Sequence, residues 1–377
     1  MKKRIKILFF TPYATRTGSE MMLLYILKNL NREHFQAGLV SFAPGELLSE
    51  VPADIPVFIG PGKYTLLEKV SYHLGFHPME RFLNKVSREF GADVWYVNTV
   101  MLPDIVKGAL KHSVPVISHI HELSHMLTFV EVEDYKRIMH QSDLLLGCSE
   151  TVSSNLRVSG GKNVRKLLSF MDLATINPSE ERINSLREEW GVKPGDYVWI
   201  MSGTSSERKG FDLLPDLAKA IDDPTVHLVW VGRLAPDGLV YLTQKRCEQV
   251  KSTRIHLVGA QKEEYYSYLA AADGFMMLSR QEPLGLVLVE AAWLGKPIVS
   301  FDSGGPGEFV VEGIGTLVPN LDITKFAQEM HHWRANPGAF DAALARRRAS
   351  EFGSETGMEA WEEIVREFCA PLVKQIS

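Results

Sequence analysis

The sequence predicts an α/β fold with two domains of similar size, each built around a parallel β-sheet. Three observations support this prediction. The chain has 377 residues, which is more than one ordinary hydrophobic core contains. Short apolar runs alternate with helical stretches along both halves of the chain. Several of these runs are apolar without alternation, as expected of strands that are buried on both faces of a parallel sheet.

Ten apolar runs are predicted to be strands, five in each half of the chain. They cover residues 4–10, 36–42, 93–98, 115–120 and 143–148, and then 197–202, 226–231, 254–258, 274–278 and 297–301. Helices are predicted between them, for example at 19–30 and 284–294. Sheets of this kind bind ligands at the carboxyl ends of their strands, so the loops that follow the strands are the best candidates for a functional site.

The alternation of strand and helix breaks between residues 171 and 196, where a Pro-Gly-Asp turn leads into a new strand. We therefore predict a first domain at residues 1–178 and a second domain at 179–355. The tail at 356–377 is predicted to be a helix with Trp361 on its apolar side.

Composition limits the class of function. The formal charge is −5, so no overall field attracts nucleic acid. The three cysteines lie far apart without metal-binding spacing, which favours a reducing compartment. No signal peptide and no apolar run of the ~20 residues that span a bilayer is evident. We expect a cytoplasmic protein, attached at most to a membrane surface. The aromatic side chains of residues 60–90 could make that attachment, but core packing explains them equally well.

The first candidate loop contains Thr17, Gly18 and Ser19, between the first predicted strand and a helix. A glycine allows the backbone to approach a ligand closely, and free N–H groups at a helix N-terminus favour anions such as phosphate. An ordinary capped helix start is the alternative interpretation.

Two histidines, His119 and His121, stand at the end of the strand predicted at 115–120. We expect their imidazoles to lie on opposite sides of the extended chain, so that they do not share a zinc ion. One imidazole in contact with a sugar and a histidine with a structural role are equally good interpretations.

The loop at 202–210 follows the first strand of the second domain and contains Gly203, Thr204, Arg208 and Lys209. Small hydroxyl residues and two cations can hold a pyrophosphate. The order of residues differs from that of a Walker loop, and a polar surface loop is the alternative interpretation.

The segment at 279–291 carries the strongest signal. Glu282 lies in a loop, Pro283 is expected to start a helix, and Gly285 and Leu286 can offer N–H groups to an anion. Glu290 follows on an apolar stretch of that helix, where a carboxylate is costly unless it has a partner. The vicinal hydroxyls of a ribose are such a partner, and a neighbouring arginine is the alternative.

The segment EPLGLVLVEA, residues 282–291, resembles the EPFGLxxxEA signature of the GT4 family of retaining glycosyltransferases, or glycosyl transferases group 1. Other segments that agree with this family in order and spacing are Gly18, His121-Glu122, Leu257-Val258-Gly259, Ala271-Ala272-Asp273 and Gly304-Gly305 with Glu308. The resemblance implies a GT-B fold, in which two Rossmann-like domains face each other across a cleft and the C-terminal helix crosses back to the first domain.

The same resemblance implies an enzyme of the hexosyltransferase type that acts in polysaccharide biosynthesis. The first domain would bind a glycan or lipid-linked acceptor, and the second a nucleotide-diphosphate sugar as co-substrate, without a metal ion or another cofactor. The implied catalytic residues are His121, Lys209 and Glu282. The predicted donor-binding residues are Gly18, Gly203, Thr204, Arg208, Lys209, Arg233, Val258, Glu282, Leu284, Gly285, Leu286 and Glu290.

One position departs from the family pattern, which places an arginine directly after the glycine and five residues before the lysine. Here that position is Thr204, and either Arg208 or Arg233 could supply the missing charge. Two alternatives therefore stay open. One is a catalytically weakened sugar-nucleotide-binding protein, and the other is another GT-B enzyme such as a sugar epimerase. The base, the donor sugar and the acceptor are left open too.

Overall fold

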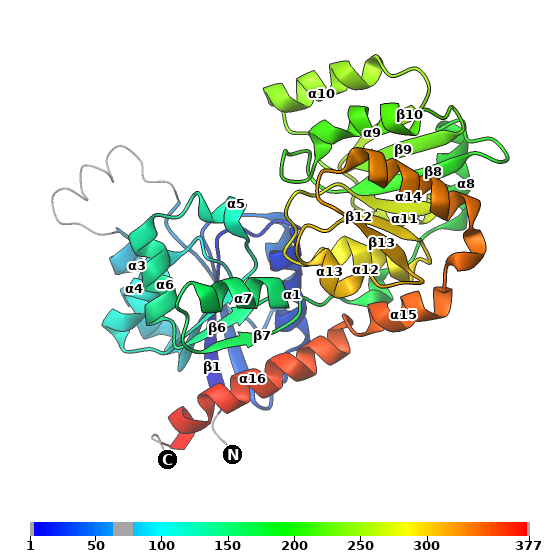
Figure 1. The fold of residues 1–377 in the computed structure, drawn as a ribbon. Coiled ribbons are helices and arrows are strands. Elements are labelled where there is room, and N and C mark those ends of the chain that lie inside the picture. The colour runs from blue at the N-terminus through cyan, green and yellow to red at the C-terminus, as the bar shows by residue number, and fades with distance from the viewer. Residues whose placement is uncertain (1–3, 63–77, 375–377) are drawn as a thin grey trace. The chain divides into compact units, whose positions relative to one another are not determined.

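The computed structural model describes residues 4–62 and 78–374 (Figure 1). The chain forms two compact units, one of Met1–Met171 together with Ser354–Ser377 and the other of Asp172–Gly353. The sequence places the corresponding junctions after residues 178 and 355. Of the aromatic residues considered for membrane contact, Tyr64, Tyr72 and Phe76 lie outside the described residues, whereas Phe82 packs against the core of the first unit.

The first unit contains a seven-stranded sheet in the order β3-β2-β1-β4-β5-β6-β7. All of its strand pairs are parallel, with Ile5 of β1 opposite Phe35 of β2 and Ile7 of β1 opposite Val94 of β4. The strands are β1 Ile5–Thr11, β2 Phe35–Ser41, β3 Val57–Ile59, β4 Val94–Val97, β5 Val116–Ile120, β6 Leu144–Gly147 and β7 Val164–Lys166.

The helices of the first unit include the long C-terminal helix α16. Its Trp361 is fully buried and packs against the rings of Phe9, Phe35 and Tyr96. These contacts hold α16 against the sheet of the first unit. The described helices of this unit are α1 Gly18–Asn29, η1 Glu46–Glu50, α3 Pro78–Phe90, α4 Pro103–His112, α5 Ser124–Leu127, α6 Val132–Gln141, α7 Glu150–Val158 and α16 Ser354–Lys374.

The second unit contains a six-stranded parallel sheet in the order β10-β9-β8-β11-β12-β13. Trp199, Phe211 and Trp230 are among the buried side chains of its core. The strands are β8 Tyr197–Ser202, β9 Val226–Val231, β10 Arg254–Gly259, β11 Gly274–Met277, β12 Ile298–Phe301 and β13 Gly315–Val318. Strand order reverses between β1 and β4 in one unit and between β8 and β11 in the other, and ligands of open α/β sheets bind at such points.

Helices flank this second sheet (Figure 1). They are η2 Leu173–Thr175, α8 Glu180–Glu189, η3 Phe211–Leu213, α9 Leu214–Ile221, α10 Gly238–Glu248, α11 Tyr265–Ala271, α12 Leu286–Trp293, α13 Pro306–Phe309, α14 Ile323–Ala335, η4 Pro337–Ala339 and α15 Ala342–Ser350. In the described part of the chain, no helix combines the length and apolar character needed to cross a membrane.

The predicted α/β fold with parallel sheets is confirmed, and each of the ten predicted strands forms. The sequence does not reveal β3, β7 and β13, which are strands of only three or four residues at the edges of the two sheets.

The expectation that Pro283 starts a helix is wrong. Glu282 forms an isolated parallel bridge with Gly304, which keeps the chain extended there, and α12 begins only at Leu286. Gly285 precedes that helix with φ of 89°, a conformation that glycine adopts at little cost.

Candidate active site

The carboxyl ends of β8 and β11 bring together the predicted residues Lys209 and Glu282. The Lys209 ammonium forms an ion pair with Oε2 of Glu282, and Ser279 Oγ donates to the same oxygen at 3.2 Å. The Lys209 and Glu282 side chains are only 15% and 9% exposed. Burial acts to raise the pKa of Glu282, but Lys209 and Arg208 together outweigh it and hold that pKa below its ordinary value.

Backbone contacts with the loop after β12 fix the position of Glu282. Its N–H donates to the carbonyl of Ser303 at 3.1 Å, and its own carbonyl accepts from the N–H of Gly305 at 2.8 Å. A side chain at position 305 would place its Cβ 2.2 Å from the carbonyl oxygen of Pro283. Only glycine therefore allows the two loops to approach this closely.

The loop after β8 holds the remaining predicted phosphate-binding groups. Arg208 donates from one guanidinium nitrogen to the carbonyl of Gln281 at 2.9 Å, and the same nitrogen lies 3.8 Å from Oε2 of Glu282. The backbone of Gly203 lies against the aliphatic stem of Lys209, about 3.5 Å from the position that a Cβ would take. Thr204 is exposed.

Arg233 follows β9, and its backbone is joined to the same loop. Its carbonyl accepts from Ser205 N–H at 3.0 Å and from Ser205 Oγ at 3.2 Å. The guanidinium is exposed, and within the described residues it forms no ion pair. Arg233 is therefore more available to an anionic ligand than Arg208, which already binds Gln281.

Helix α12 presents its N-terminus at the same edge of the sheet. The first N–H groups of a helix have no partner within it, and together with the helix dipole they favour an anion. Gly285 and Leu286 stand at this end, and the preceding Leu284 is buried beneath it. Val258, on the edge strand β10, is half-buried.

Glu290 has a partner that the sequence interpretation missed. The hydroxyl of Tyr265, the first residue of α11, donates to Oε2 of Glu290 at 2.7 Å. Burial raises the pKa of Glu290 to about 7, and the hydrogen bond from Tyr265 offsets only part of that effect. The expectation of a polar partner was sound, but a tyrosine at a helix start also suits an apolar core, so sequence alone did not identify it.

In the first unit, the imidazole rings of His119 and His121 lie 4.0 Å apart between centroids. The expectation that they lie on opposite sides of the chain is wrong, because alternate residues of an extended chain share a face. Nδ1 of His119 lies 2.8 Å from the hydroxyl of Tyr96, which is buried in the sheet. His121 is half-buried and closer to the surface.

Asn98, a residue that the sequence interpretation missed, determines the tautomer of His121. Its Nδ2 donates to the carbonyl of Ser19 at 3.0 Å, so its Oδ1 is the atom that faces Nε2 of His121, at 3.0 Å. Nε2 must then carry the proton, which leaves Nδ1 as a hydrogen-bond acceptor. Burial lowers the pKa of His121 to about 3, so the ring is neutral.

Glu122 and Gly18 complete the first-unit residues at the carboxyl ends of β1, β4 and β5. Glu122 accepts hydrogen bonds from the hydroxyl of Thr99 and from the N–H groups of Val100 and His121. Burial nevertheless raises its pKa. Gly18 opens α1, and a Cβ added there would meet no atom within 4 Å. The backbone of Gly18 is therefore open to a ligand.

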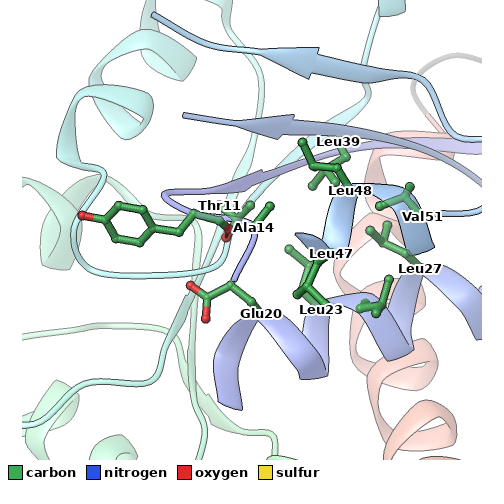
Figure 2. A pocket seen from close by; sticks show the side chains of 11 residues that line it. Thr11, Ala14, Glu20, Leu23, Leu27, Leu39, Leu47, Leu48 and Val51 are labelled. Atoms are coloured by element: carbon green, nitrogen blue, oxygen red, sulfur yellow. Dashed lines mark hydrogen bonds between the residues drawn. The ribbon is translucent and has the colours of Figure 1, made fainter. Parts of the chain in front are cut away.

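A small hollow in the first unit lies between α1 and η1 (Figure 2). Its walls are almost entirely apolar, and Glu20 stands at one end with its carboxylate turned away from the leucine side chains. None of the predicted site residues lines it. The lining residues are Thr11, Tyr13, Ala14, Glu20, Leu23, Leu24, Leu27, Leu39, Leu47, Leu48 and Val51.

Known structures share this fold. HepE from Anabaena, solved in complex with UDP-glucose, is 23% identical and has a TM-score of 0.82 over 97% of this chain and 100% of that one. WaaG, a glycosyltransferase of lipopolysaccharide biosynthesis, has a TM-score of 0.68 at 13% identity over 94% of this chain and 99% of that one. These GT-B structures confirm the predicted fold.

Curated proteins share its sequence over shorter spans. A GDP-mannose-dependent phosphatidylinositol monomannoside mannosyltransferase from Mycolicibacterium smegmatis is 26% identical over 268 residues, which are 65% of this chain and 67% of the relative. The lipopolysaccharide core biosynthesis glycosyltransferase LpsE from Rhizobium meliloti is 34% identical over 43% of this chain and 45% of its own length. Residues 182–353 match the family model of glycosyl transferases group 1. The predicted resemblance to glycosyl transferases group 1 is therefore confirmed over residues 182–353, and the predicted enzyme class, a glycosyltransferase, is confirmed.

Proposed function

We propose that this glycosyltransferase moves a hexose from a nucleotide-diphosphate sugar to a glycan, lipid or small-molecule acceptor, with retention of the anomeric configuration and without a metal ion or bound cofactor. The observation that carries the proposal is the arrangement around α12. Lys209 and the helix N-terminus can receive a diphosphate, and Glu290 can receive a ribose. The neighbours HepE and the mycobacterial mannosyltransferase support it, since their names specify UDP-glucose and GDP-mannose.

In the proposed reaction, the bond between the anomeric carbon and the diphosphate oxygen breaks, and the electron pair stays on that oxygen. Fixed positive groups stabilise such a charge best where it forms. Lys209, the N-terminus of α12 and Arg233 supply them in the second unit. The acceptor oxygen then bonds to the anomeric carbon on the face from which the diphosphate leaves, and its proton passes to the departing diphosphate.

Lys209 and Glu282 have coupled roles in this proposal. The cations Lys209 and Arg208 keep the Glu282 carboxylate charged, and the diphosphate shares Lys209 when it binds. Glu282 then offers its carboxylate oxygens to sugar hydroxyls. Because Ser279 and the contacts with Ser303 and Gly305 hold Glu282 in place, the carboxylate does not have to reorganise when the donor arrives.

The first unit is proposed to bind the acceptor. His121 offers Nδ1 to an acceptor hydroxyl, because Asn98 occupies Nε2. The relatives named as phosphatidylinositol mannoside and lipopolysaccharide core enzymes support a glycan or lipid-linked acceptor, which this protein would meet at a membrane surface.

The test is a panel of UDP-, GDP- and ADP-sugars, with nucleotide release measured with and without a lipid-linked or oligosaccharide acceptor. We expect one donor class to release its nucleotide faster when acceptor is present, at an unchanged rate in EDTA. NMR of the product then reports the anomeric configuration. Failure of every nucleoside diphosphate to bind would overturn the proposal.

A second candidate function, a sugar-nucleotide-binding protein with weakened catalysis, is favoured by one observation. Thr204 occupies the position of the arginine that the family pattern places before Lys209, so the diphosphate loses one positively charged partner. Tight nucleotide binding without turnover on any acceptor would favour this second function, whereas release that depends on acceptor would exclude it.

A further inference from the structure

We propose that Tyr265 is a positioning residue for ribose recognition, because its hydroxyl holds one oxygen of Glu290 and directs the other toward the ribose. The inference rests on the proposed function, in which Glu290 accepts the ribose hydroxyls. It extends that function to a residue on a separate helix, α11.

The Tyr265 hydroxyl links α11 to α12 through a side-chain hydrogen bond. Its proton is donated to Oε2 of Glu290 at 2.7 Å. A phenol has one proton to donate and can accept a hydrogen bond in return. The donated hydrogen bond therefore restrains the rotation of the Glu290 carboxylate.

In the described part of the chain, Tyr265 and not a cationic side chain is the partner of the Glu290 carboxylate. Glu290 lies on a helix whose neighbouring side chains Leu288, Val289, Ala291 and Ala292 are buried. Among the side chains that the structure describes, in residues 4–62 and 78–371, no lysine, arginine or histidine forms an ion pair with Glu290. The side chain is half-buried rather than enclosed, so a ligand can reach the carboxylate while Tyr265 holds Oε2.

The hydrogen bond from Tyr265 has a further consequence for recognition. A free carboxylate can rotate and accept from many directions. Here Oε2 accepts the hydrogen bond from Tyr265, so Oε1 and the remaining lone pair of Oε2 present one fixed pattern of acceptors. Two vicinal hydroxyls match such a pattern, and a sugar without them does not. Burial also raises the pKa of Tyr265 well above its ordinary value, so the phenol keeps the proton that it donates.

The test compares a ribonucleotide with its 2′,3′-dideoxy analogue in four proteins: the wild type, Tyr265→Phe, Glu290→Gln and the matched control Tyr266→Phe. Calorimetry measures the affinity for UDP, GDP and ADP first, and the tightest of the three is used. Tyr265→Phe should lower the ribonucleotide affinity about tenfold, the effect of one hydrogen bond to a charged group. It should leave the dideoxy affinity unchanged, and Tyr266→Phe should change neither.

An equal loss for both ligands in Tyr265→Phe would overturn the inference, because it would mean that the ring acts through packing alone. So would an unchanged ribonucleotide affinity. If the wild-type protein binds no nucleoside diphosphate, the proposed function fails, and this inference fails with it. A ligand-free readout stands beside these measurements. In ¹³C-glutamate NMR, Tyr265→Phe should move the titration of Glu290 upward from about pH 7, since the hydrogen bond that stabilises the carboxylate is lost, and an unmoved titration would contradict the inference.

Discussion

The Lys209 ammonium is paired with the Glu282 carboxylate, although the two residues are 73 positions apart in the chain. They come from the loops after β8 and β11, at the point where strand order reverses. Both side chains are largely withdrawn from water. Removal of one partner leaves the other as an uncompensated charge, which is more costly than removal of both.

This relationship predicts coupled effects on turnover and stability. Lys209→Ala should lower kcat about 100-fold or more, as expected when one donor to a developing anion is lost. It should also lower the temperature of unfolding, because Glu282 keeps its charge without its main partner. Lys209→Ala with Glu282→Gln should be more stable than Lys209→Ala alone. Lys209→Arg is the control that keeps the charge. Strictly additive changes in unfolding free energy would contradict the coupling.

Glu290 predicts a pH dependence of nucleotide binding. Its pKa is raised to about 7 in the unliganded protein, so the carboxyl group is largely protonated at pH 6 and ionised at pH 8. The ionised form is the better acceptor of ribose hydroxyls, so affinity should rise as pH increases through 7. Because the nucleotide phosphate also titrates, the quantity to measure is the affinity ratio of wild type to Glu290→Gln. A ratio that stays constant from pH 6 to pH 8 would contradict this assignment.

The family pattern places an arginine at position 204, where this chain has a threonine. Arg233 is expected to supply the positive charge of that arginine. Arg233→Ala should weaken nucleoside diphosphate binding about tenfold, as expected for one charge-assisted hydrogen bond, and should reduce the salt dependence of binding. Arg208→Ala should mainly lower stability, since Arg208 binds the Gln281 carbonyl. Thr204→Arg should restore affinity to the Arg233→Ala protein. Calorimetry and thermal unfolding separate the two arginines. Weak binding only in Arg208→Ala would assign the phosphate to Arg208 instead.

The open surroundings of Gly18 predict that its replacement by alanine lowers activity without lowering stability. Its φ is not in the left-handed region and a Cβ would meet open space, so Gly18→Ala should stabilise α1 by about 0.5–1 kcal/mol. Turnover should nevertheless fall if a ligand approaches this backbone. Gly238→Ala is the matched control, since Gly238 also begins a helix and has the same open space. Full activity in Gly18→Ala would show that no ligand passes close to Gly18.

Asn98 predicts a change in the tautomer of His121. In Asn98→Ala, Nε2 loses its acceptor, so the ring should populate both neutral tautomers and kcat should fall. Asn98→Asp keeps an acceptor at the same place and should keep the proton on Nε2. ¹⁵N NMR of the imidazoles, assigned by comparison with His121→Gln, reports the tautomer directly. An Nε2–H tautomer that persists in Asn98→Ala would show that another group determines it.

The sequence by itself determined the parts that depend on local pattern. Apolar runs without alternation predicted the parallel strands, because burial on both faces of a sheet leaves no polar positions. The segment 282–291 predicted the family, and the position of Lys209 after a strand predicted a ligand site. Glu290 was predicted to need a polar partner because its helix is otherwise apolar. Each of these inferences used neighbouring residues only.

The tertiary structure decided which distant groups meet. Tyr265 reaches Glu290 from another helix, and Asn98 reaches His121 from another strand end, so no local pattern marks either pair. Helix α12 begins at Leu286 and not at the predicted Pro283, because Glu282 pairs with Gly304. Only the packing of the loop after β12 creates that contact. Hydrogen bonds and ion pairs depend on distance in space. The sequence can therefore show that a buried charge needs a partner, but the tertiary structure determines which residue lies close enough to be that partner.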